Sequence, residues 1–518
     1  MKDQELINQA YYNLNQKNFD LAEKYFVKLL KKYPADIGYL NALAFTKHSL
    51  KKIDESMALL KKSLIIQPNQ FDCIKNLVIS QIDMNLLQDA LETLKIGLSF
   101  FSENHEIFYL QGNIYLRLNM FSEAVGSYKK SLELNPKFFD SFLNLGFTHN
   151  KNKEYEEAIS AYQKAIVLNQ NSDRAHYNLA ITFNNIHDYK NAIFHYEQSI
   201  KLNPNNDVAK FNLSILYLSK KKFDDGWKLW EHRWYELQKP AFTNKIKSCK
   251  EIEKNKKTLI WGEQGIGEQI LYGSMVGDLK EKENLTISLD KRLLTIYERS
   301  FKNLKFIDKD YVVNESGYDY QIAMGSIGAF LRNNDNSFKD QPKKYLFAEK
   351  EKSDQFKFMI NSKKKFICGL SWVSRNENIG SDKSIRLEEI IKILDPKKFE
   401  FVDLQYGDNE KEIQDIKRNY DVDIINLKSL DKFKDIDGLA SLIDVCDFVI
   451  TVSNVTAHLS GALGKKTFLL APHEYGSMWH WHYGKTSPWY PSVEIFRKKN
   501  ESSWTEPLKE LSEEIKKL

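Results

Sequence analysis

Residues 121–138 read FSEAVGSYKKSLELNPKF, and residues 155–172, which begin 34 positions later, read YEEAISAYQKAIVLNQNS. The same spacing recurs between residues 20 and 236 at three positions, which hold a small residue, a large apolar residue, and a proline or polar residue. The small residues are Ala22, Ser56, Ala90, Ala124, Ala158, Ala192 and Gly226, the large ones are Phe26, Leu60, Leu94, Tyr128, Tyr162, Tyr196 and Trp230, and the third set is Pro34, Pro68, Ser102, Pro136, Gln170 and Pro204. Small residues let paired helices approach, large side chains fill the gaps between them, and proline ends the second helix. The spacing therefore predicts a repeated pair of helices.

This period resembles that of tetratricopeptide repeats (TPR), of which about six and a half fit residues 3–236. We predict an all-α TPR solenoid over residues 1–236, ending in a capping helix. Arrays of this type bind peptides or proteins and rarely carry out chemistry. The resemblance therefore implies a protein partner for this part of the chain.

One register of the predicted first helices holds asparagine in five of seven repeats, although asparagine is a mediocre helix residue. These residues are Asn8, Asn76, Asn144, Asn178 and Asn212, whereas Ala42 and Leu110 break the series. Duplication within an Asn-rich chain would explain them. The other explanation is a ladder of amides that donate to and accept from the backbone of an extended peptide. A similar ladder lines the TPR array of O-GlcNAc transferases, and we predict that these asparagines bind an acceptor peptide.

The seventh repeat is rich in tryptophan. Trp227, Trp230 and Trp234 are spaced to lie on one face of a helix. We expect a capping helix that buries this face against the next domain, with His232 off the face and solvated. Residues 237–257 are polar and rich in lysine, and we predict that they form a linker.

Composition narrows the class of protein. The chain has 518 residues, room for about three domains, and a net charge of +5 without an Arg-rich stripe, so nucleic-acid binding is disfavoured. The cysteines are single and scattered, which favours neither a zinc site nor disulfides: Cys73, Cys249, Cys368 and Cys446. The start lacks the apolar core of a signal peptide, and no run of about 18 apolar residues occurs. We expect a soluble, cytoplasmic protein with no membrane insertion.

From Thr258 onward the chain alternates between short apolar segments and amphipathic helices. The predicted strands are Thr258–Trp261, Leu285–Leu289, Tyr320–Ala323, Phe366–Ser371, Phe399–Leu404, Val422–Ile425, Phe448–Val452, Thr467–Leu470 and Val493–Phe496. Two parallel series of this kind predict two doubly wound, Rossmann-like α/β domains, over residues 258–340 and 365–500. We expect residues 333–364 to link them and residues 501–518 to form a C-terminal helix.

A glycine-rich loop follows the first of these strands. It reads GEQGIGE over residues 262–268, where Gly265 and Gly267 let the backbone approach an anionic ligand at the start of a helix. Glu268 can act as a general base there, or it can simply satisfy the helix dipole. The glycine order is not that of dinucleotide-binding loops, although Asp290 stands where a ribose-binding acid would. An NAD-dependent oxidoreductase is therefore a minor alternative.

The segment SNVTAHLSGALGK, residues 453–465, follows the apolar strand 448–452. Ser453, Asn454 and Thr456 place hydroxyls, an amide and free backbone N–H groups at one helix start, which suits a diphosphate. Ser453 can also serve as an ordinary N-cap. His458, one turn into the helix, suits either core packing or ligand contact.

Two other patterns suggest metal sites but fit them poorly. The D-x-D pairs 421–423 and 435–437 do not follow an apolar strand, so we interpret them as solvated acids. The spacing of His480 and His482 in WHWH, residues 479–482, suits a metal clamp poorly. We expect packing there, or an aromatic lid over a sugar or base.

Residues 258–500 resemble GT-B glycosyltransferases of the ADP-heptosyltransferase type (glycosyltransferase family 9). The matching segments are EQGIGE at 263–268, GLSW at 369–372, Lys383-Ser384, LQYGD at 404–408 and SNVTAHLSGALGK at 453–465. With the repeats, the whole chain is similar to TPR-linked protein O-glycosyltransferases, including those that modify flagellin. This resemblance implies that Glu268 stands where the family has an aspartate as the base that activates the acceptor.

The same resemblance implies the donor site. Its phosphate contacts are Ser371, Ser374 and Lys383, its nucleotide-base contacts are Gln405 and Tyr406, and its diphosphate turn is Ser453, Asn454, Thr456, Ala457 and His458. The implied activity is inverting, metal-independent transfer of a sugar from a nucleotide-sugar substrate, without a cofactor, to a Ser/Thr hydroxyl of a protein held by the array. The first α/β domain is short, so part of the acceptor wall must come from the TPR side. The alternatives are a non-catalytic TPR scaffold with a degenerate GT-B domain, and a transferase acting on a lipopolysaccharide-type glycan.

Overall fold

The computed structural model describes residues 3–235, 252, 256–279, 282–310, 317–362, 364, 366–377, 379–473, 478–499 and 503–518. The chain divides into two compact units, Met1–Pro204 and Asn205–Leu518. Each is described by itself below. The predicted linker 237–257 lies outside the described residues except for residues 252, 256 and 257.

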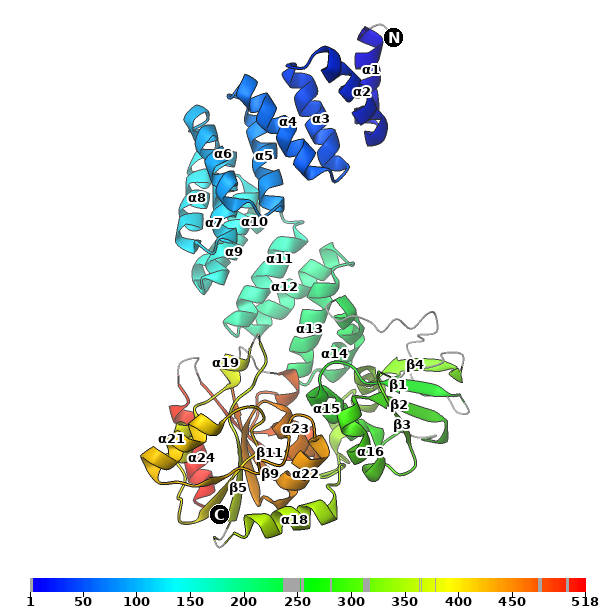
Figure 1. Cartoon of the computed structure of the whole chain (residues 1–518), viewed down its shortest axis with the longest axis vertical. Coiled ribbons are helices and arrows are strands. Elements are labelled where there is room, and N and C mark those ends of the chain that lie inside the picture. The colour runs from blue at the N-terminus through cyan, green and yellow to red at the C-terminus, as the bar shows by residue number, and fades with distance from the viewer. Residues whose placement is uncertain are drawn as a thin grey trace. The chain divides into compact units, whose positions relative to one another are not determined.

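The first unit consists of helix pairs that follow one another along the chain (Figure 1). Its helices are α1 (Asp3–Asn15), α2 (Phe19–Lys32), α3 (Ile37–Ser49), α4 (Ile53–Ile66), α5 (Phe71–Asp83), α6 (Leu87–Phe100), α7 (His105–Arg117), α8 (Phe121–Leu134), α9 (Phe139–Lys151), α10 (Tyr155–Leu168), α11 (Asp173–Asn185) and α12 (Tyr189–Leu202). The predicted repeat of helix pairs is confirmed.

The residues that set the repeat are buried between these helices. Ala124 and Tyr128 on α8 are fully buried, and the ring of Tyr128 lies against Gly112 of α7. A Cβ atom at Gly112 would lie only 2.5 Å from that ring, so a glycine is needed there. Gly146 and Tyr162 repeat this contact one repeat later, with a corresponding distance of 2.7 Å. The aromatic residues thus fill gaps opened by glycine as well as by alanine.

The turn inside each repeat shows a second regularity, which the sequence pattern did not indicate. A non-glycine residue with a left-handed backbone, φ between 58° and 68°, recurs every 34 residues just after the first helix. These residues are Lys17, Lys51, Asn85, Asn119, Lys153, His187 and Lys221. A left-handed residue commonly ends a helix, and glycine or asparagine adopts that conformation most easily. Lysine occupies four of the seven turns.

The second unit begins with the helices of the seventh repeat, α13 (Asp207–Ser219) and α14 (Phe223–Trp230), followed by the 3-10 turn η1 (Glu231–Tyr235). The sequence placed them with the array, but they belong to the α/β unit because their aromatic face packs into its core. The rings of Trp227 and Trp230 lie 5.7 and 5.6 Å from that of Trp479, centroid to centroid, and the Trp227 indole N–H donates to the carbonyl of Arg332 at 2.7 Å. The expected burial of the tryptophan face is confirmed for these two residues.

The unit contains two parallel sheets. The first has the order β3-β2-β1-β4, from β1 (Thr258–Trp261), β2 (Leu285–Leu289), β3 (Lys305–Asp308) and β4 (Tyr320–Ala323), with α15 (Ile266–Val276) after β1 and α16 (Leu294–Ser300) after β2. The predicted strands of this sheet are confirmed, and β3 was missed.

The second sheet has the order β10-β11-β9-β8-β5-β6-β7. Its strands are β5 (Phe366–Ser371), β6 (Phe399–Asp403), β7 (Ile424–Ile425), β8 (Phe448–Val452), β9 (Lys466–Ala471), β10 (Thr486–Ser487) and β11 (Tyr490–Arg497). Its other helices are α19 (Gly380–Lys383), α20 (Leu387–Ile391), α21 (Glu410–Tyr420), α22 (Ile436–Val445), α23 (Val455–Ala462) and α24 (Thr505–Ile515). All pairs are parallel except β10 with β11. The six predicted strands are found here, and only the short β10 was not predicted.

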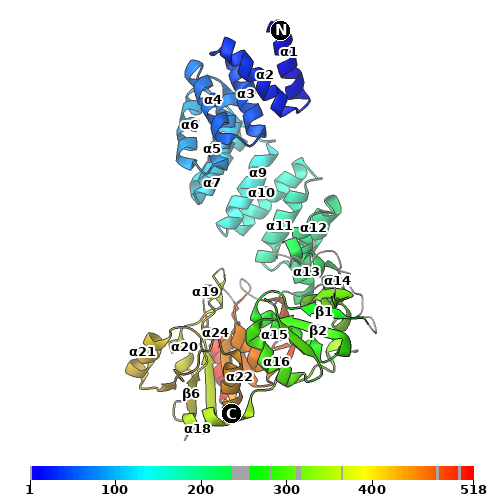
Figure 2. The ribbon, with the colours of Figure 1, turned by 45° about the vertical axis from the view of Figure 1, so that its right-hand side comes forward.

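The segment 333–364 is not the simple linker that its composition suggested. It contains α18 (Lys350–Ile360), which packs along α22 and buries Phe356 and Ile360 (Figures 1 and 2). Just before it, the N–H groups of Tyr345 and Leu346 donate to the carbonyl of Ala462 at 3.0 and 3.1 Å. Most of this segment is therefore part of the folded core.

No helix among the described residues is both long enough and apolar enough to cross a membrane.

The glycine contact in the repeats predicts opposite effects of two glycine-to-alanine changes. Gly112→Ala places a methyl group against the Tyr128 ring and should lower the free energy of unfolding by about 1–3 kcal/mol. Gly126→Ala on the exposed face of α8 meets no atom within 4 Å and should raise it by about 0.5–1 kcal/mol. Urea unfolding followed by circular dichroism measures both, and a stabilising Gly112→Ala would contradict this account of the packing.

Candidate functional site

The predicted site residues follow the carboxyl ends of neighbouring strands. In each sheet the strand order reverses beside the first strand, at β1/β4 in the first sheet and at β5/β8 in the second. Ligands of open α/β sheets bind outside such reversal points. The glycine loop follows β1, Ser371 ends β5, and Ser453 and Asn454 follow β8. Contacts between α15 and α23 bring the helices after β1 and β8 together.

Glu268 lies in the first turn of α15 and is half-buried. Burial raises the pKa of its carboxyl, while the backbone of Gly265 and of Glu268 itself and the charge of Lys383 act in the opposite direction. The carboxylate therefore interacts with the start of its own helix, as the helix-dipole interpretation expected, and also faces a lysine, as a base beside an anion site would. The left-handed residue of this loop is Gln264, with φ 58°, rather than either glycine.

Lys383 ends the short helix α19 and is buried, with a relative exposure of 5%. Burial lowers the pKa of its ammonium group, and the nearby Glu268 carboxylate opposes that effect. Its side chain has no hydrogen-bond or ion-pair partner within the described parts of the chain. A buried cation is normally paired, so Lys383 is poised to bind an anion.

His458 on α23 lies directly against the glycine loop. A Cβ atom at Gly267 would come within 2.8 Å of the His458 ring, so the glycine allows α15 and α23 to approach this closely. The Nδ1 atom of His458 lies 2.9 Å from the Tyr490 hydroxyl. Burial, and then the charge of Lys383, lower the pKa of His458 to about 3, which keeps the ring neutral. The structure thus brings Gly267, Glu268, Lys383 and His458 together.

Three residues predicted to contact the nucleotide-sugar donor form a hydrogen-bonded group at the carboxyl ends of β5, β6 and β8. The Gln405 amide oxygen accepts from the Ser371 hydroxyl at 3.1 Å and from the N–H groups of Trp372 and Val373. The Asn454 amide donates to the Ser371 hydroxyl at 2.9 Å and to the carbonyl of Val373. These side chains are occupied by the protein itself. Ser371, Gln405 and Asn454 therefore hold the loop after β5, and their contact with a donor stays a prediction.

Asn454 also corrects the expected helix start. Its side chain accepts from the Ala457 N–H, so Asn454 caps α23 and Ser453 does not. The Ser453 hydroxyl instead accepts from the indole N–H of Trp481 at 2.9 Å. Ala457 is buried in the first turn of α23, and the buried hydroxyl of Thr456 has no hydrogen-bond partner among the described residues.

The remaining predicted donor contacts lie at the outer part of this edge. The Ser374 backbone N–H donates to the Ser384 hydroxyl at 3.0 Å, and Ser374 is buried. Tyr406 is half-buried, its hydroxyl accepts from the Arg375 N–H at 3.4 Å, and its ring lies 5.9 Å from that of Phe433. Gly265 is exposed at the start of α15.

The WHWH segment is packed inside the unit. Packing was one of the two arrangements expected from the sequence. Trp479 contacts Trp227 and Trp489, and Trp481 is fully buried beside His458. His480 is also fully buried, with a ring centroid 4.9 Å from that of His458, and neither of its ring nitrogens has a hydrogen-bond partner in the part of the chain that the structure describes. Burial, His458 and Lys383 keep the pKa of His480 well below its ordinary range.

The acidic pairs behave differently from one another. Asp421 and Asp423 are exposed and pair with Lys417, so their interpretation as solvated acids is confirmed. That interpretation is wrong for the other pair, because Asp435 caps α22 and Asp437 is buried against Arg299. Asp290 pairs with Arg292 and Lys309, and Arg292 is the main cause that lowers its pKa to about 2. The protein itself therefore uses the Asp290 carboxylate.

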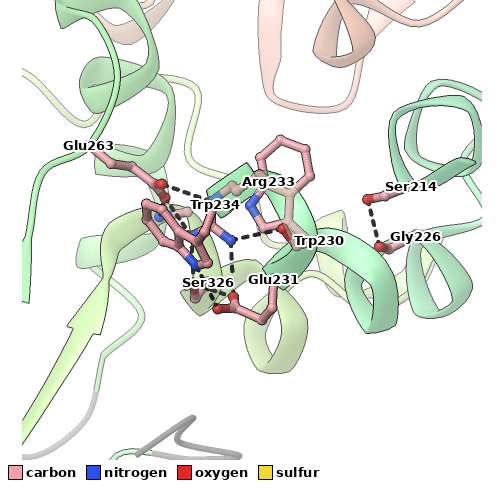
Figure 3. Close-up of polar contacts among 9 residues, drawn as sticks. Ser214, Gly226, Trp230, Glu231, Arg233, Trp234, Glu263 and Ser326 are labelled. Carbon is pink, nitrogen blue, oxygen red and sulfur yellow. Dashed lines mark hydrogen bonds and ion pairs between the residues drawn. The ribbon is translucent and has the colours of Figure 1, made fainter. Parts of the chain in front are cut away.

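A buried ion pair beside the glycine loop was not predicted (Figure 3). Arg233 of η1 and Glu263 of the loop form two parallel hydrogen bonds, Nε to Oε2 at 2.8 Å and Nη2 to Oε1 at 3.0 Å. The N–H of Gly325, just after β4, also donates to Glu263 at 2.7 Å. The only sequence signal was an arginine set among the tryptophans of the seventh repeat and a glutamate within the EQGIGE motif.

The asparagine register of the first unit varies in its surroundings. Asn8 and Asn76 are exposed, whereas Asn144 and Asn178 are half-buried, and Asn212 lies on α13 of the second unit. The Asn144 side-chain amide donates to the Asn113 side-chain oxygen Oδ1 at 2.8 Å. The same oxygen also accepts from the Tyr128 hydroxyl. Both asparagines line a cavity of about 300 Å³ between α5, α7 and α9, whose other walls are Ile79, Ile82, Asp83, Leu110, Leu116 and Arg117. The cavity thus offers apolar walls, two amides and two charged side chains, Asp83 and Arg117.

Known proteins resemble parts of this chain. Models of tetratricopeptide repeats match residues 105–138 and 173–206, and further models of this repeat match residues 127–160 and 150–185. The Protein FlbA of Caulobacter vibrioides is 26% identical over 313 residues, which make up 56% of this chain and 52% of that protein. The chain therefore spans about half the length of this curated relative.

Two solved structures show low similarity to this chain. The structure of YrrB, described as a TPR protein with an unusual peptide-binding site, is 17% identical, and the match covers 36% of this chain and 95% of that one with a TM-score of 0.30. A tetratricopeptide repeat protein from Parabacteroides merdae is 16% identical, and the match covers 44% and 90% with a TM-score of 0.39. On the repeat models and the observed helix pairs, the N-terminal array of this chain consists of tetratricopeptide repeats.

Proposed function

We propose that this protein is an inverting glycosyltransferase that moves a sugar from a nucleotide-sugar donor to a hydroxyl group of a protein acceptor. The observation that carries the proposal is the buried Lys383, which has no hydrogen-bond or ion-pair partner among the described residues and lies near Glu268 and His458 at the reversal points of two sheets. A diphosphate supplies the anion that such a lysine lacks, and the first turn of α23 adds backbone N–H groups. The resemblance of residues 258–500 to GT-B transferases supports the same donor class.

The proposed transfer forms one bond at the anomeric carbon and breaks another. The acceptor oxygen forms a bond to the anomeric carbon while its proton passes to the Glu268 carboxylate. The bond from the anomeric carbon to the nucleotide phosphate breaks, and its electron pair leaves with the diphosphate. Lys383 and the N-terminus of α23 stabilise the negative charge that develops there, an effect worth about 10²–10³ in rate for each well-placed donor. The neutral His458 can accept or donate a hydrogen bond without adding charge.

The TPR array is the proposed acceptor-binding part. Its repeats support binding of a protein, and the cavity at Asn113 and Asn144 offers an apolar space beside two amides that suits a side chain of an extended peptide. Flagellin is the acceptor suggested by the similar TPR-linked transferases. The second candidate function is a TPR scaffold without catalysis, which is favoured by the interaction of Glu268 with its own helix start.

Glu268→Gln tests catalysis directly. The change keeps the size of the side chain and one acceptor oxygen but removes the base, so sugar transfer should fall by about 10²–10⁴-fold. Donor affinity should stay nearly unchanged. Transfer is measured with labelled UDP-, GDP-, ADP- and CMP-linked sugars, using purified flagellin and lipopolysaccharide as separate acceptors. Equal transfer by the variant would remove Glu268 from the mechanism, and transfer only to lipopolysaccharide would identify a glycan acceptor.

The pH dependence of the same assay tests the interaction between the Glu268 carboxylate and the Lys383 ammonium group. Glu268 must be deprotonated to act, so the rate should rise with pH through its pKa, which burial has raised. Lys383→Met removes a positive charge that favours the carboxylate, so the acid limb at saturating donor should move to higher pH. An acid limb that stays in place would show that Lys383 does not act on Glu268.

The asparagine register predicts a separate effect on acceptor binding. Replacing both Asn144 and Asn178 by alanine removes amides of the proposed ladder and should weaken flagellin binding about 3–10-fold per lost hydrogen bond. Nucleotide-sugar hydrolysis should not change. The control is Asn171→Ala, an exposed asparagine in a loop outside this register. Calorimetric titration with flagellin measures the effect, and unchanged affinity in the double variant would contradict the ladder.

A further inference from the structure

The Arg233 guanidinium has a hydrogen-bond partner for every one of its N–H groups. Nε and Nη2 bond to Glu263, Nη1 donates to the Trp230 carbonyl and the Glu231 carboxylate at 3.0 Å each, and Nη2 also donates to the Ser326 hydroxyl at 2.8 Å. Arginine carries five such donors, so none is left for a ligand. Arg233 is fully buried, and its guanidinium carbon lies 4.1 Å from the Trp234 ring centroid. Its partners are therefore parts of the protein, and its role is positional.

These bonds join three separate segments at one point (Figure 3). Arg233 comes from the end of the seventh repeat, Glu263 from the glycine loop, and Gly325 and Ser326 from the turn after β4. The fit is close, since a Cβ atom at Gly325 would lie 2.3 Å from the Glu263 carboxylate. Glu263 is held by Arg233 on one side and by Gly325 on the other. These contacts fix the start of the glycine loop.

The loop transmits this position to the proposed base. Only Gln264, in a left-handed conformation, and Gly265, the N-cap of α15, separate Glu263 from the helix that carries Glu268. Tyr272, one turn after Glu268, packs against Gly325, so the same turn after β4 also contacts α15. A shift of Glu263 therefore moves the first turn of α15 and its carboxylate.

We propose that Arg233 of the seventh repeat is a positioning residue for Glu268, which it places by holding Glu263 of the glycine loop. This inference rests on the proposed function, because it assigns a consequence for catalysis. It makes the last repeat a working part of the transferase site as well as the end of the array.

The test compares Arg233→Lys with Arg332→Lys in the full chain. Lysine keeps the charge at position 233 but cannot form the two parallel bonds to Glu263. Arg332 is similarly buried and bonds to Asp278 and Gln341, near the opposite end of α15 and away from the glycine loop. It therefore controls for loss of a buried arginine. Glu263→Gln, which removes the charge from the other side of the pair, is a second variant that should behave like Arg233→Lys.

Two readouts are made on folded protein, hydrogen exchange and turnover. Arg233→Lys should speed exchange of the backbone amides of residues 262–269 by about tenfold or more, while residues 448–462 and the Arg332→Lys protein keep the wild-type rates. It should also lower kcat by about 10–100-fold with little change in donor affinity.

Two results would overturn the proposal. One is an unchanged loop in Arg233→Lys and Glu263→Gln, and the other is an equal effect of Arg332→Lys on the loop or on kcat. If the wild-type protein transfers no sugar, the proposed function and the catalytic part of this inference fail together. The exchange comparison then still decides whether Arg233 positions the loop, which separates the two failures.

Discussion

The buried ion pair between Arg233 and Glu263 is the interaction on which the arrangement of the second unit depends. Burying two charges is favourable only when their remaining donors and acceptors are satisfied, and here all five Arg233 donors have partners. Removal of one partner from such a pair costs about 3–5 kcal/mol, so the three segments that meet there are strongly tied. Together with the packing of Trp227 and Trp230 against Trp479, this pair joins the seventh repeat to the α/β region, although its sequence continues the spacing of the array.

The strand order of the two sheets determines where the candidate site lies. In both sheets the strand order reverses beside the first strand. At each reversal point the loops at the carboxyl ends of two neighbouring strands separate, which leaves a position for a ligand. The close contact of Gly267 with His458 brings the loops of the two sheets together. Glu268, Lys383 and His458 then share one electrostatic environment, while Ser371, Gln405 and Asn454 hold the loops from behind. A nucleotide diphosphate is the ligand that we propose for this place.

Much of the fold could be predicted because the relevant signals are local and repeated. The 34-residue spacing and apolar segments such as Phe448–Val452 require no knowledge of distant partners. The strand β3 was missed because Lys305–Asp308 is short and partly exposed at a sheet edge. The candidate site residues lie in the loops and helix starts that the sequence indicated, but the internal hydrogen bonds of Gln405 and Asn454 could not be predicted. Their partners, like the Arg233 partner of Glu263, are about 30 or more residues away and are fixed only by the tertiary structure.

The central claim is that the second unit binds a nucleotide sugar through Lys383. Calorimetric titration of the full chain with UDP-, GDP-, ADP- and CMP-linked sugars, with NAD as a control, tests this most directly when it is repeated on Lys383→Ala. The account predicts that one nucleotide class binds the wild-type protein and loses at least about tenfold in affinity in the variant, a difference of about 1.4 kcal/mol. Binding of none of these donors, binding of NAD alone, or equal affinity in the variant would contradict it.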